Sequence, residues 1–185
     1  GLSFFLVETY TPNADGTRTR HATLERVEEK LGHHASATVT VNFDKTPAQL
    51  VGQRGDGFKQ MLLLMNNARI GVGFESLGLC ESAWRMAAQY ASVRQSMGKT
   101  IDQHELVADM LDEMQAAVEG LRALCMRVAM LNETYQRKRM RLMFLVEEGS
   151  AEYATLKKEV TALKSRTREL TPLVKLAASE TAVQM

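Results

Sequence analysis

The sequence predicts a mainly α-helical protein, an antiparallel helical bundle preceded by a few β-strands from an incomplete β domain. Residues 1–52 are rich in β-branched and aromatic residues, which favours strands. From Gly57 onward, apolar residues recur at steps of three and four, which indicates helices. Three long amphipathic segments and one short one are typical of an antiparallel bundle. We therefore place a partial β domain at 1–52 and a helical bundle domain at 53–185.

The strand region opens with GLSFFLVE at residues 1–8, and ATVTVNF at residues 37–43 alternates apolar and polar side chains. Such alternation predicts half-buried strands. Asp15-Gly16 predicts a turn between strands. We expect three or four strands, too few to form an independently stable sheet unless other structure covers their faces.

The helical region starts with a segment from Gly57 to about residue 93. A second helix is predicted from about 103 to 133, with Asp102 and Glu105 as an N-cap pair. Its apolar stripe is Val107, Met110, Met114, Val118, Leu121, Cys125 and Val128.

Residues 134–149 lose this periodicity and are expected to form a connector, after which a third helix begins behind Ser150. Pro172 disfavours helical geometry at Thr171 and suits the first turn of a helix, so a fourth segment capped by Thr171 is predicted.

Composition excludes several classes of protein. Apolar residues make up 45% of the 185 positions, enough for a packed core, and 23 basic side chains nearly balance 22 acidic ones. The net charge of +1 therefore gives no general attraction to nucleic acid or anionic lipid. No apolar stretch approaches the roughly 20 residues of a membrane span. Cys80 and Cys125 lie in apolar helical patterns, which indicates reduced core thiols in a cytoplasmic protein.

The stretch YASVRQSMGKTIDQHELVADM, residues 90–110, is the first candidate site. Arg94 ends one predicted helix, Ser96, Met97, Gly98 and Lys99 follow, and His104 and Glu105 open the next helix. A guanidinium fork, a hydroxyl and free N–H groups at a helix start can hold a diphosphate, as in a dinucleotide cofactor. Ordinary helix capping is the alternative for Glu105, and a solvated loop residue is the alternative for His104.

The second candidate is MNNARIGVG, residues 65–73, where Asn66, Asn67 and Arg69 lie beside an apolar stripe. Two amides and a cation could hold the amides and phosphates of an extended ligand. Alternatively, the two asparagines only break a helix into two pieces.

The run GQRGDGFKQMLLLMNNARIGVGFESLGLCESAWRMAAQYASVRQSMGKTIDQHELVADMLDEM, residues 52–114, resembles the acyl-CoA dehydrogenases where their β domain meets the C-terminal bundle. KLGHHASATVTVNF and QLVGQRGDGF resemble the preceding strands of that family. The resemblance covers residues 1 to about 131 and resumes in LTPLVKLAASETAVQM. EEKLGHHAS and an inserted helix at about 134–170 are similar to the branch that includes the 3-methylmercaptopropionyl-CoA dehydrogenases.

The resemblance implies an FAD enzyme that oxidises an acyl-CoA thioester to the α,β-enoyl-CoA and passes electrons to an electron-transfer flavoprotein. It implies that Arg94 and Ser96 reach the FAD diphosphate, with Met97, His104 and Glu105 nearby, usually on the flavin of a neighbouring subunit. Met97 replaces a common aromatic residue and Glu105 a common glutamine. Asn66, Asn67 and Arg69 match positions that contact the coenzyme A portion of the substrate.

The catalytic base is the missing part of this resemblance. Some members of the family carry it on the first bundle helix, but Ala68 occupies that position and accepts no proton. Glu75 and Glu81 are displaced from it. We expect the base to lie after residue 185. The last predicted helix is still running at residue 185, and the chain starts like a strand, without a leader, so we expect a fragment. Without the base, this fragment is expected to be inactive.

Three further expectations complete the interpretation. The family implies a homodimer or homotetramer, and an oxidase using oxygen is an alternative to a dehydrogenase. A different class, a non-catalytic module that binds a partner or nucleic acid, would use Arg137, Lys138, Arg139 and Arg141. A solvated connector is the more common role for such a cluster, so nucleic acid is not the expected partner.

Overall fold

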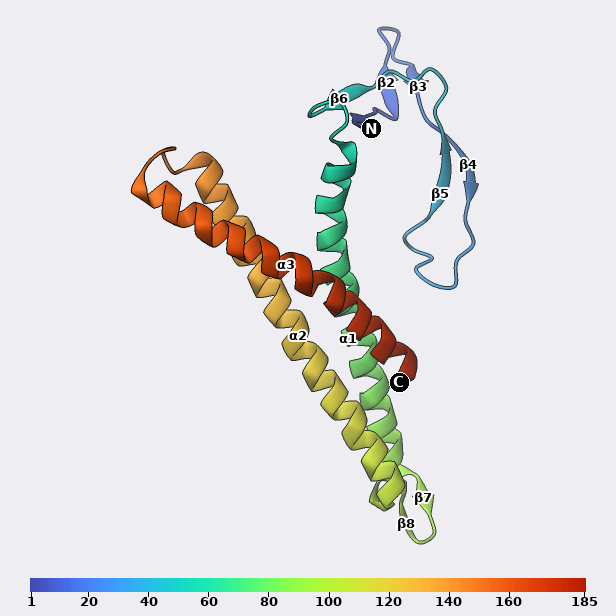
Figure 1. Ribbon diagram of the computed structural model, residues 1–185. Coiled ribbons are helices and arrows are strands. Elements are labelled where there is room, and N and C mark those ends of the chain that lie inside the picture. Colours follow the sequence, from blue (N-terminus) through green and yellow to red (C-terminus); the bar gives the residue numbers. More distant parts are fainter. The chain divides into compact units, whose positions relative to one another are not determined.

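The computed structural model describes all residues from 1 to 185 and contains two compact units, Gly1–Leu63 and Leu64–Met185. Helices predominate, and the strands are short and antiparallel, as the sequence predicts (Figure 1). The prediction of the fold class is therefore confirmed. The division at residue 52 and the insertion at about 134–170 remain predictions about domain organisation.

The first unit contains six strands in three separate antiparallel pairs. β1 (Phe4–Leu6) pairs with β6 (Gln49–Val51), β2 (Tyr10–Pro12) with β3 (Arg18–Arg20), and β4 (Thr23–Val27) with β5 (Val39–Asn42). No strand residue is buried, so these pairs form without a core of their own.

The turn predicted at Asp15-Gly16 joins β2 and β3. The Asp15 carboxylate accepts hydrogen bonds from the Thr17 backbone N–H at 2.9 Å and from the Thr17 hydroxyl at 2.6 Å. These bonds, the hydroxyl bond first, lower the pKa of Asp15. Gly16 has a φ of 82°, which a residue without a Cβ adopts without strain.

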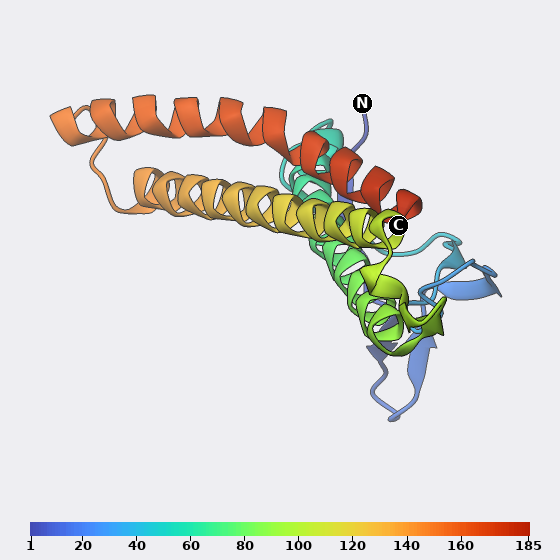
Figure 2. The same ribbon diagram turned by 90° about the horizontal axis from the view of Figure 1, so that it is seen from below.

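The second unit is built from three long helices. α1 (Gly57–Val93) crosses from the first unit, α2 (Glu105–Phe144) follows a short corner, and α3 (Ala151–Gln184) returns along α2. Figure 2 shows α2 and α3 running side by side to their connection. The core contains Ile70, Leu77, Cys80, Val118, Leu121, Cys125, Val128, Val174 and Ala178. Four members of the predicted stripe on α2 are among them, whereas Met110 is exposed.

Both cysteines are free and fully buried, as predicted. Burial raises the pKa of both thiols, because a thiolate loses its hydration among apolar side chains. Neither thiol is therefore a ready nucleophile.

The predicted connector at residues 134–149 is wrong over most of its length, because α2 continues to Phe144. Tyr135 is buried, and Arg137 bonds Glu133 one turn earlier at 2.6 Å. Lys138 and Arg141 pair with Glu159 and Glu152 of α3. Three of the four basic residues of this stretch thus have carboxylate partners, and all four belong to the helix, which the loss of apolar periodicity concealed.

The predicted fourth segment is also wrong, since Pro172 lies inside α3. The buried Thr167 and Thr171 precede it, and their hydroxyls donate to the carbonyls of Leu163 and Thr167. Val174 and Ala178, about one and two helical turns after Thr171, are fully buried. Packing on both sides of the proline therefore keeps one helix, which bends in its later half (Figure 2), as a proline inside a helix causes.

α3 begins directly after Ser150, as the sequence predicts, and Ser150 caps it: its hydroxyl accepts a hydrogen bond from the Tyr153 N–H at 3.0 Å. Replacing Ser150 with alanine should lower the free energy of unfolding by about 1 kcal/mol, because this N–H loses its partner. Chemical denaturation measures the change. Ser165→Ala, in the exposed middle of α3, is the matched control and should cause no such loss. Equal stability of the two variants would contradict the capping role.

Candidate functional site

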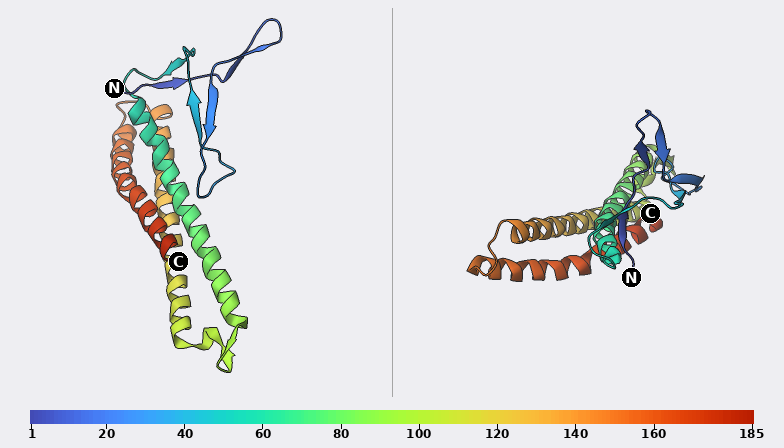
Figure 3. Two further views of the ribbon diagram at one scale, coloured as in Figure 1. Left: turned by 90° about the vertical axis from the view of Figure 1, so that its right-hand side faces the viewer. Right: turned by 90° about the horizontal axis from the view of Figure 1, so that it is seen from above.

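The corner between α1 and α2 is a small β-hairpin (Figure 3, left). β7 (Gln95–Ser96) pairs with β8 (Lys99–Thr100), and the Ile101 N–H donates to the Arg94 carbonyl at 2.9 Å. Met97 and Gly98 form the two-residue turn with φ values of 51° and 81°. Two positive values are typical of a type I′ hairpin turn. Met97 therefore holds a conformation that costs a residue with a Cβ roughly 1 kcal/mol.

Two side chains tie the hairpin to the start of α2. The Nε2–H of His104 donates to the Ser96 carbonyl at 3.1 Å, and Lys99 Nζ donates to the Gln103 carbonyl at 2.7 Å. These contacts hold the hairpin in place, a role of Lys99 and His104 that the sequence did not reveal. The only indication of this role in the sequence is the spacing of Lys99 and His104 around a short turn that contains a glycine.

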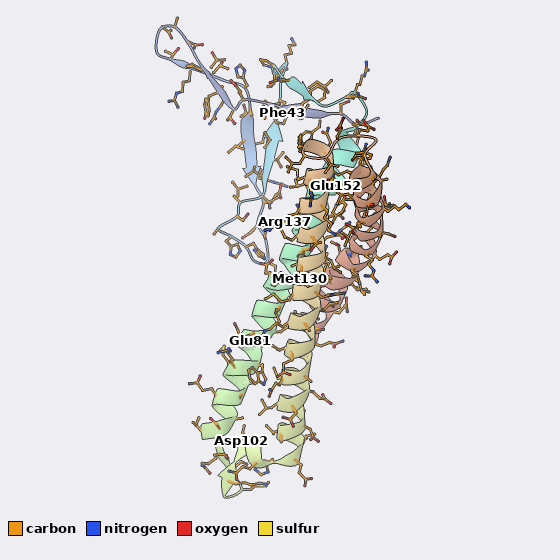
Figure 4. All side chains as sticks on the ribbon, turned by 90° about the vertical axis from the view of Figure 1, so that its left-hand side faces the viewer. Phe43, Glu81, Asp102, Met130, Arg137 and Glu152 are labelled. Carbon is orange, nitrogen blue, oxygen red and sulfur yellow. The ribbon has the colours of Figure 1, made fainter.

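The predicted N-cap pair at this corner is wrong. Asp102 lies inside a single 3-10 turn, Ile101–Gln103, and His104 occupies the N-cap position without a side-chain cap bond. Glu105 is the first residue of α2, where its exposed carboxylate favourably faces the positive end of the helix dipole. Asp102, labelled in Figure 4, has a buried Oδ1 without a hydrogen-bond partner.

The five residues predicted for a cofactor all lie at this corner. Arg94, Ser96, Met97 and Glu105 are exposed and His104 is half-buried. Neither the Arg94 guanidinium nor the Ser96 hydroxyl bonds any other group of the chain, and Met97 is 93% exposed at the tip of the hairpin. The corner thus offers a free cation, a free hydroxyl and one apolar side chain.

The second predicted set lies on α1, which runs unbroken through Asn66 and Asn67, so the helix-break alternative is wrong. Arg69 Nη1 donates to Asn66 Oδ1 at 3.1 Å. Asn132 Nδ2 of α2 donates to Asn67 Oδ1 at 3.2 Å. Asn66 therefore orients the guanidinium, whereas Asn67 ties α1 to α2.

A groove beside Arg69 was not anticipated. It has a volume of about 440 Å³ and is lined by Arg69 of α1 and by Pro172, Lys175, Leu176 and Ser179 of α3. Lys175 could not have been paired with Arg69 from the sequence, because their proximity depends on how α3 crosses α1.

Glu81, labelled on α1 in Figure 4, is held by two guanidinium groups. Its Oε1 accepts a hydrogen bond from Arg85 Nε at 2.6 Å, and its Oε2 pairs with Arg122 of α2. The hydrogen bond from Arg85 is the largest effect on the pKa of Glu81 and lowers it; desolvation opposes this, but the charges of Arg122 and Arg85 add to the lowering, so the pKa is lowered overall. A carboxylate held in this way is a poor proton acceptor.

This pairing predicts a pH dependence of stability. Because the pKa of Glu81 is lower in the folded protein, its stabilising effect is complete above the unfolded-state pKa and is lost as the pH falls through the folded-state value. The stability gap between the wild type and Glu81→Gln should therefore narrow on acidification. Denaturation curves at a series of pH values measure this gap. Glu113→Gln, an exposed residue of α2 without an ion pair, is the control. If the difference in stability stayed constant down to strongly acidic pH, the pKa of Glu81 would be the same in the folded and unfolded protein, which would contradict the prediction.

The family model described as "Acyl-CoA dehydrogenase, C-terminal domain" matches residues 55–185. The helical unit, its corner and the sequence therefore define a C-terminal acyl-CoA dehydrogenase bundle. The chain belongs to the acyl-CoA dehydrogenase family.

Individual relatives agree with this assignment. The chain is 34% identical over 136 residues to the 3-methylmercaptopropionyl-CoA dehydrogenase of Ruegeria pomeroyi, a match that covers 67% of this chain and 23% of the relative. The chain spans about a third of the length of the first curated relatives that it matches.

Two solved structures share the fold. One, described as the apo-form of Bd2924, is 29% identical with a TM-score of 0.76, and the match covers 98% of this chain and 32% of that one. An acyl-CoA dehydrogenase of Bacillus anthracis complexed with FAD is 22% identical with a TM-score of 0.66, over 96% of this chain and 31% of that one. No helix of the protein combines the length and apolar character that crossing a membrane requires.

Proposed function

We propose that this chain supplies the C-terminal bundle of an FAD-dependent acyl-CoA dehydrogenase that converts an acyl-CoA thioester to its α,β-enoyl-CoA. The observation that carries the proposal is the free guanidinium of Arg94 at the corner, within the part of the chain that matches the family model. A cation without an internal partner at the end of a long helix is available for an anionic ligand.

The donor groups at the corner fit the diphosphate of FAD. Arg94 would hold it through a bidentate fork and Ser96 through its hydroxyl, while Met97 would reach an apolar part of a neighbouring subunit. His104 acts through the Ser96 carbonyl, so it positions the hairpin. Glu105 stays with its own helix start, because a carboxylate beside a diphosphate is repelled. Bound FAD would supply the acceptor for the hydride that leaves the β carbon.

The substrate lies on the other candidate set. Arg69, oriented by Asn66, would contact the coenzyme A portion of the thioester. Asn67 would contribute by fixing α1 to α2 through Asn132.

The proton of the α carbon needs a carboxylate that α1 does not supply at the position of Ala68. Glu81 is held between Arg85 and Arg122 and does not serve. We therefore infer that the 185-residue chain alone does not turn over acyl-CoA.

Partners follow from the same assignment. Electrons pass to an electron-transfer flavoprotein in the cytoplasm, and the enzyme is a homodimer or homotetramer. An exposed apolar stripe on the later half of α1 supports assembly, since large exposed apolar patches mark interfaces. The stripe consists of Leu79, Met86, Tyr90 and Val93, which are 61%, 72%, 59% and 69% exposed.

The basic cluster on α2 does not favour the alternative of nucleic-acid binding. Arg137, Lys138 and Arg141 each have a carboxylate partner, which reduces the field that would attract phosphates.

The experiment is an activity assay on the protein at its natural length. Enoyl-CoA formation is followed with saturated acyl-CoA substrates, using either an electron-transfer flavoprotein or oxygen as acceptor. We expect turnover with the flavoprotein and little with oxygen. Fast turnover with oxygen would make the enzyme an oxidase, and no product with any acyl-CoA would refute the proposed function.

A further inference from the structure

The first half of α2 carries an exposed face with negative charge only. Between residues 105 and 121 this helix contains no lysine or arginine. Four exposed carboxylates follow one another at steps of four, three and seven, which keep side chains on one face of a helix. This acidic stripe consists of Glu105, Asp109, Asp112 and Glu119. None of the four has an ion pair, and Glu119 accepts a hydrogen bond only from the neutral amide of Gln115, at 2.9 Å.

One exposed face of α3 carries the opposite charge. Four cations recur at steps of seven, four and seven, which again place side chains on one helical face. This basic stripe consists of Lys157, Lys164, Arg168 and Lys175. None of the four has a carboxylate partner, and Lys157 lies 5.5 Å from the centroid of the Tyr153 ring. The second unit thus presents two unpaired stripes of opposite sign.

Opposite charges on α2 and α3 do pair where the two helices bring them together. Lys138 and Arg141 of α2 bond Glu159 and Glu152 of α3 beside the connection between the helices. The two stripes lie apart from each other. The acidic stripe lies next to the corner, which α3 does not reach, whereas the basic stripe begins near the start of α3 (Figures 1 and 3). Each stripe therefore lacks a counter-charge within its own chain.

Both faces also have a shape that lets another helix approach. On α2, small exposed residues lie on the face of the carboxylates, namely Ala116, Gly120 and Ala123, and nothing lies within 4 Å of the Cβ that Gly120 lacks. On α3, a shallow hollow of about 600 Å³ is lined by Ala154, Lys157, Lys158, Thr161 and Ala162. The distance between packed helices depends on the side chains at the contact, so small residues allow the charged groups to reach across.

We propose that a second copy of this chain docks on these faces, with the acidic stripe of one copy against the basic stripe of the other. This inference deepens the homo-oligomer of the proposed function, on which it rests, and it uses faces other than the apolar stripe on α1. The exposed carboxylates and cations would then be paired between copies, and the small residues would lie in the contact.

Two features favour a second copy over an unrelated acidic partner. The complementary face is part of the same polypeptide, so each copy supplies both charges. The spacings also match, because Asp112 and Glu119 are seven residues apart, as are Lys157 and Lys164. At 1.5 Å per residue, both pairs have a separation of about 10.5 Å along their helices, so two ion pairs can form side by side.

Sedimentation equilibrium of the full chain at low and high salt tests this contact. The Debye length falls from about 10 Å at 0.1 M to about 3 Å at 1 M ionic strength, so an association between exposed charges should weaken. One triple variant reverses the acidic stripe through Asp109→Lys, Asp112→Lys and Glu119→Lys. A second reverses the basic stripe through Lys157→Glu, Lys164→Glu and Arg168→Glu. Each alone should associate at least about tenfold more weakly than the wild type at low salt, because like charges then face each other.

An equimolar mixture of the two variants tests the pairing itself. The first variant has two positive stripes and the second has two negative ones, so the mixture should recover the association that each variant loses alone. The control variant reverses three exposed carboxylates outside the acidic stripe, through Glu147→Lys, Glu148→Lys and Glu180→Lys. It changes the net charge as much as the first variant does and should associate like the wild type.

The remaining outcomes would overturn the inference. An association that neither salt nor stripe reversal weakens would leave the apolar stripe on α1 as the interface. A mixture that stays dissociated would refute the pairing of the two stripes. A wild type that is monomeric at low salt, but binds poly-L-glutamate through the basic stripe, would replace the second copy with another acidic partner. None of these results involves FAD or acyl-CoA, so a failure of the proposed function would appear separately, in the activity assay.

Discussion

Replacing Gly73 with leucine should lower the free energy of unfolding by about 3 kcal/mol, at the upper end of the effect of overpacking. Gly73 is buried where α1 meets α3, and a Cβ there would overlap Cγ1 of Val174 and lie 3.5 Å from Sγ of Cys125. Val174 is itself fully buried and has no flexible end that could move aside. Chemical denaturation of the purified chain measures the loss.

Gly78→Leu is the matched control for this prediction. It changes the same residue type on the same helix, but nothing lies within 4 Å of the Cβ that it adds. It should stabilise the protein by about 0.8 kcal/mol, because leucine has a higher helix propensity than glycine. If both leucine variants had the same stability, the result would contradict the close packing of α3 against Gly73. It would also contradict the position of the groove beside Arg69, which depends on that packing.

Replacing Arg94 with alanine should weaken FAD binding about a hundredfold in the protein at its natural length, because two charge-assisted hydrogen bonds to the diphosphate are lost. Arg94→Lys keeps the charge without the fork and should fall between the wild type and alanine. Equilibrium dialysis of the apoprotein against FAD measures the affinities.

Arg127→Ala, at an exposed arginine of α2 without an ion pair, controls for the loss of one positive charge. It should bind FAD as tightly as the wild type. Since the Arg94 side chain makes no hydrogen bond or ion pair within the chain, its replacement should also leave the thermal unfolding midpoint unchanged. If Arg94→Ala bound FAD as tightly as the wild type, the proposal that this corner binds the FAD diphosphate would be refuted.

The parts of the fold that depend on local sequence could be predicted. The turn at Asp15-Gly16 and the start of α3 after Ser150 each depend on hydrogen bonds that span at most three residues. The stripe from Val118 to Val128 is buried because helical periodicity alone places these residues on one face.

The parts that failed depend on contacts between distant segments. The basic end of α2 stays helical through Glu152 and Glu159 on α3, which local periodicity cannot include. Pro172 remains inside α3 because buried residues lie on both sides of it. The preference of the residue before a proline for extended geometry depends only on sequence neighbours, so a prediction based on it ends the helix too early.

The candidate site divides in the same way. Arg94 to Glu105 is contiguous in sequence, so gathering these residues at one corner needed only a tight turn between helices. The bond from His104 to Ser96 and the position of Lys175 beside Arg69 depend on the hairpin register and on the crossing of α3 over α1. Neither leaves a pattern in the linear sequence.

The most direct test of the central claim is the visible spectrum of the natural-length protein during anaerobic titration with acyl-CoA. The account predicts a bound flavin whose oxidised band bleaches in proportion to the added thioester and is unaffected by the free carboxylic acid. A natural-length protein without flavin, or one whose flavin band no acyl-CoA bleaches, would contradict it.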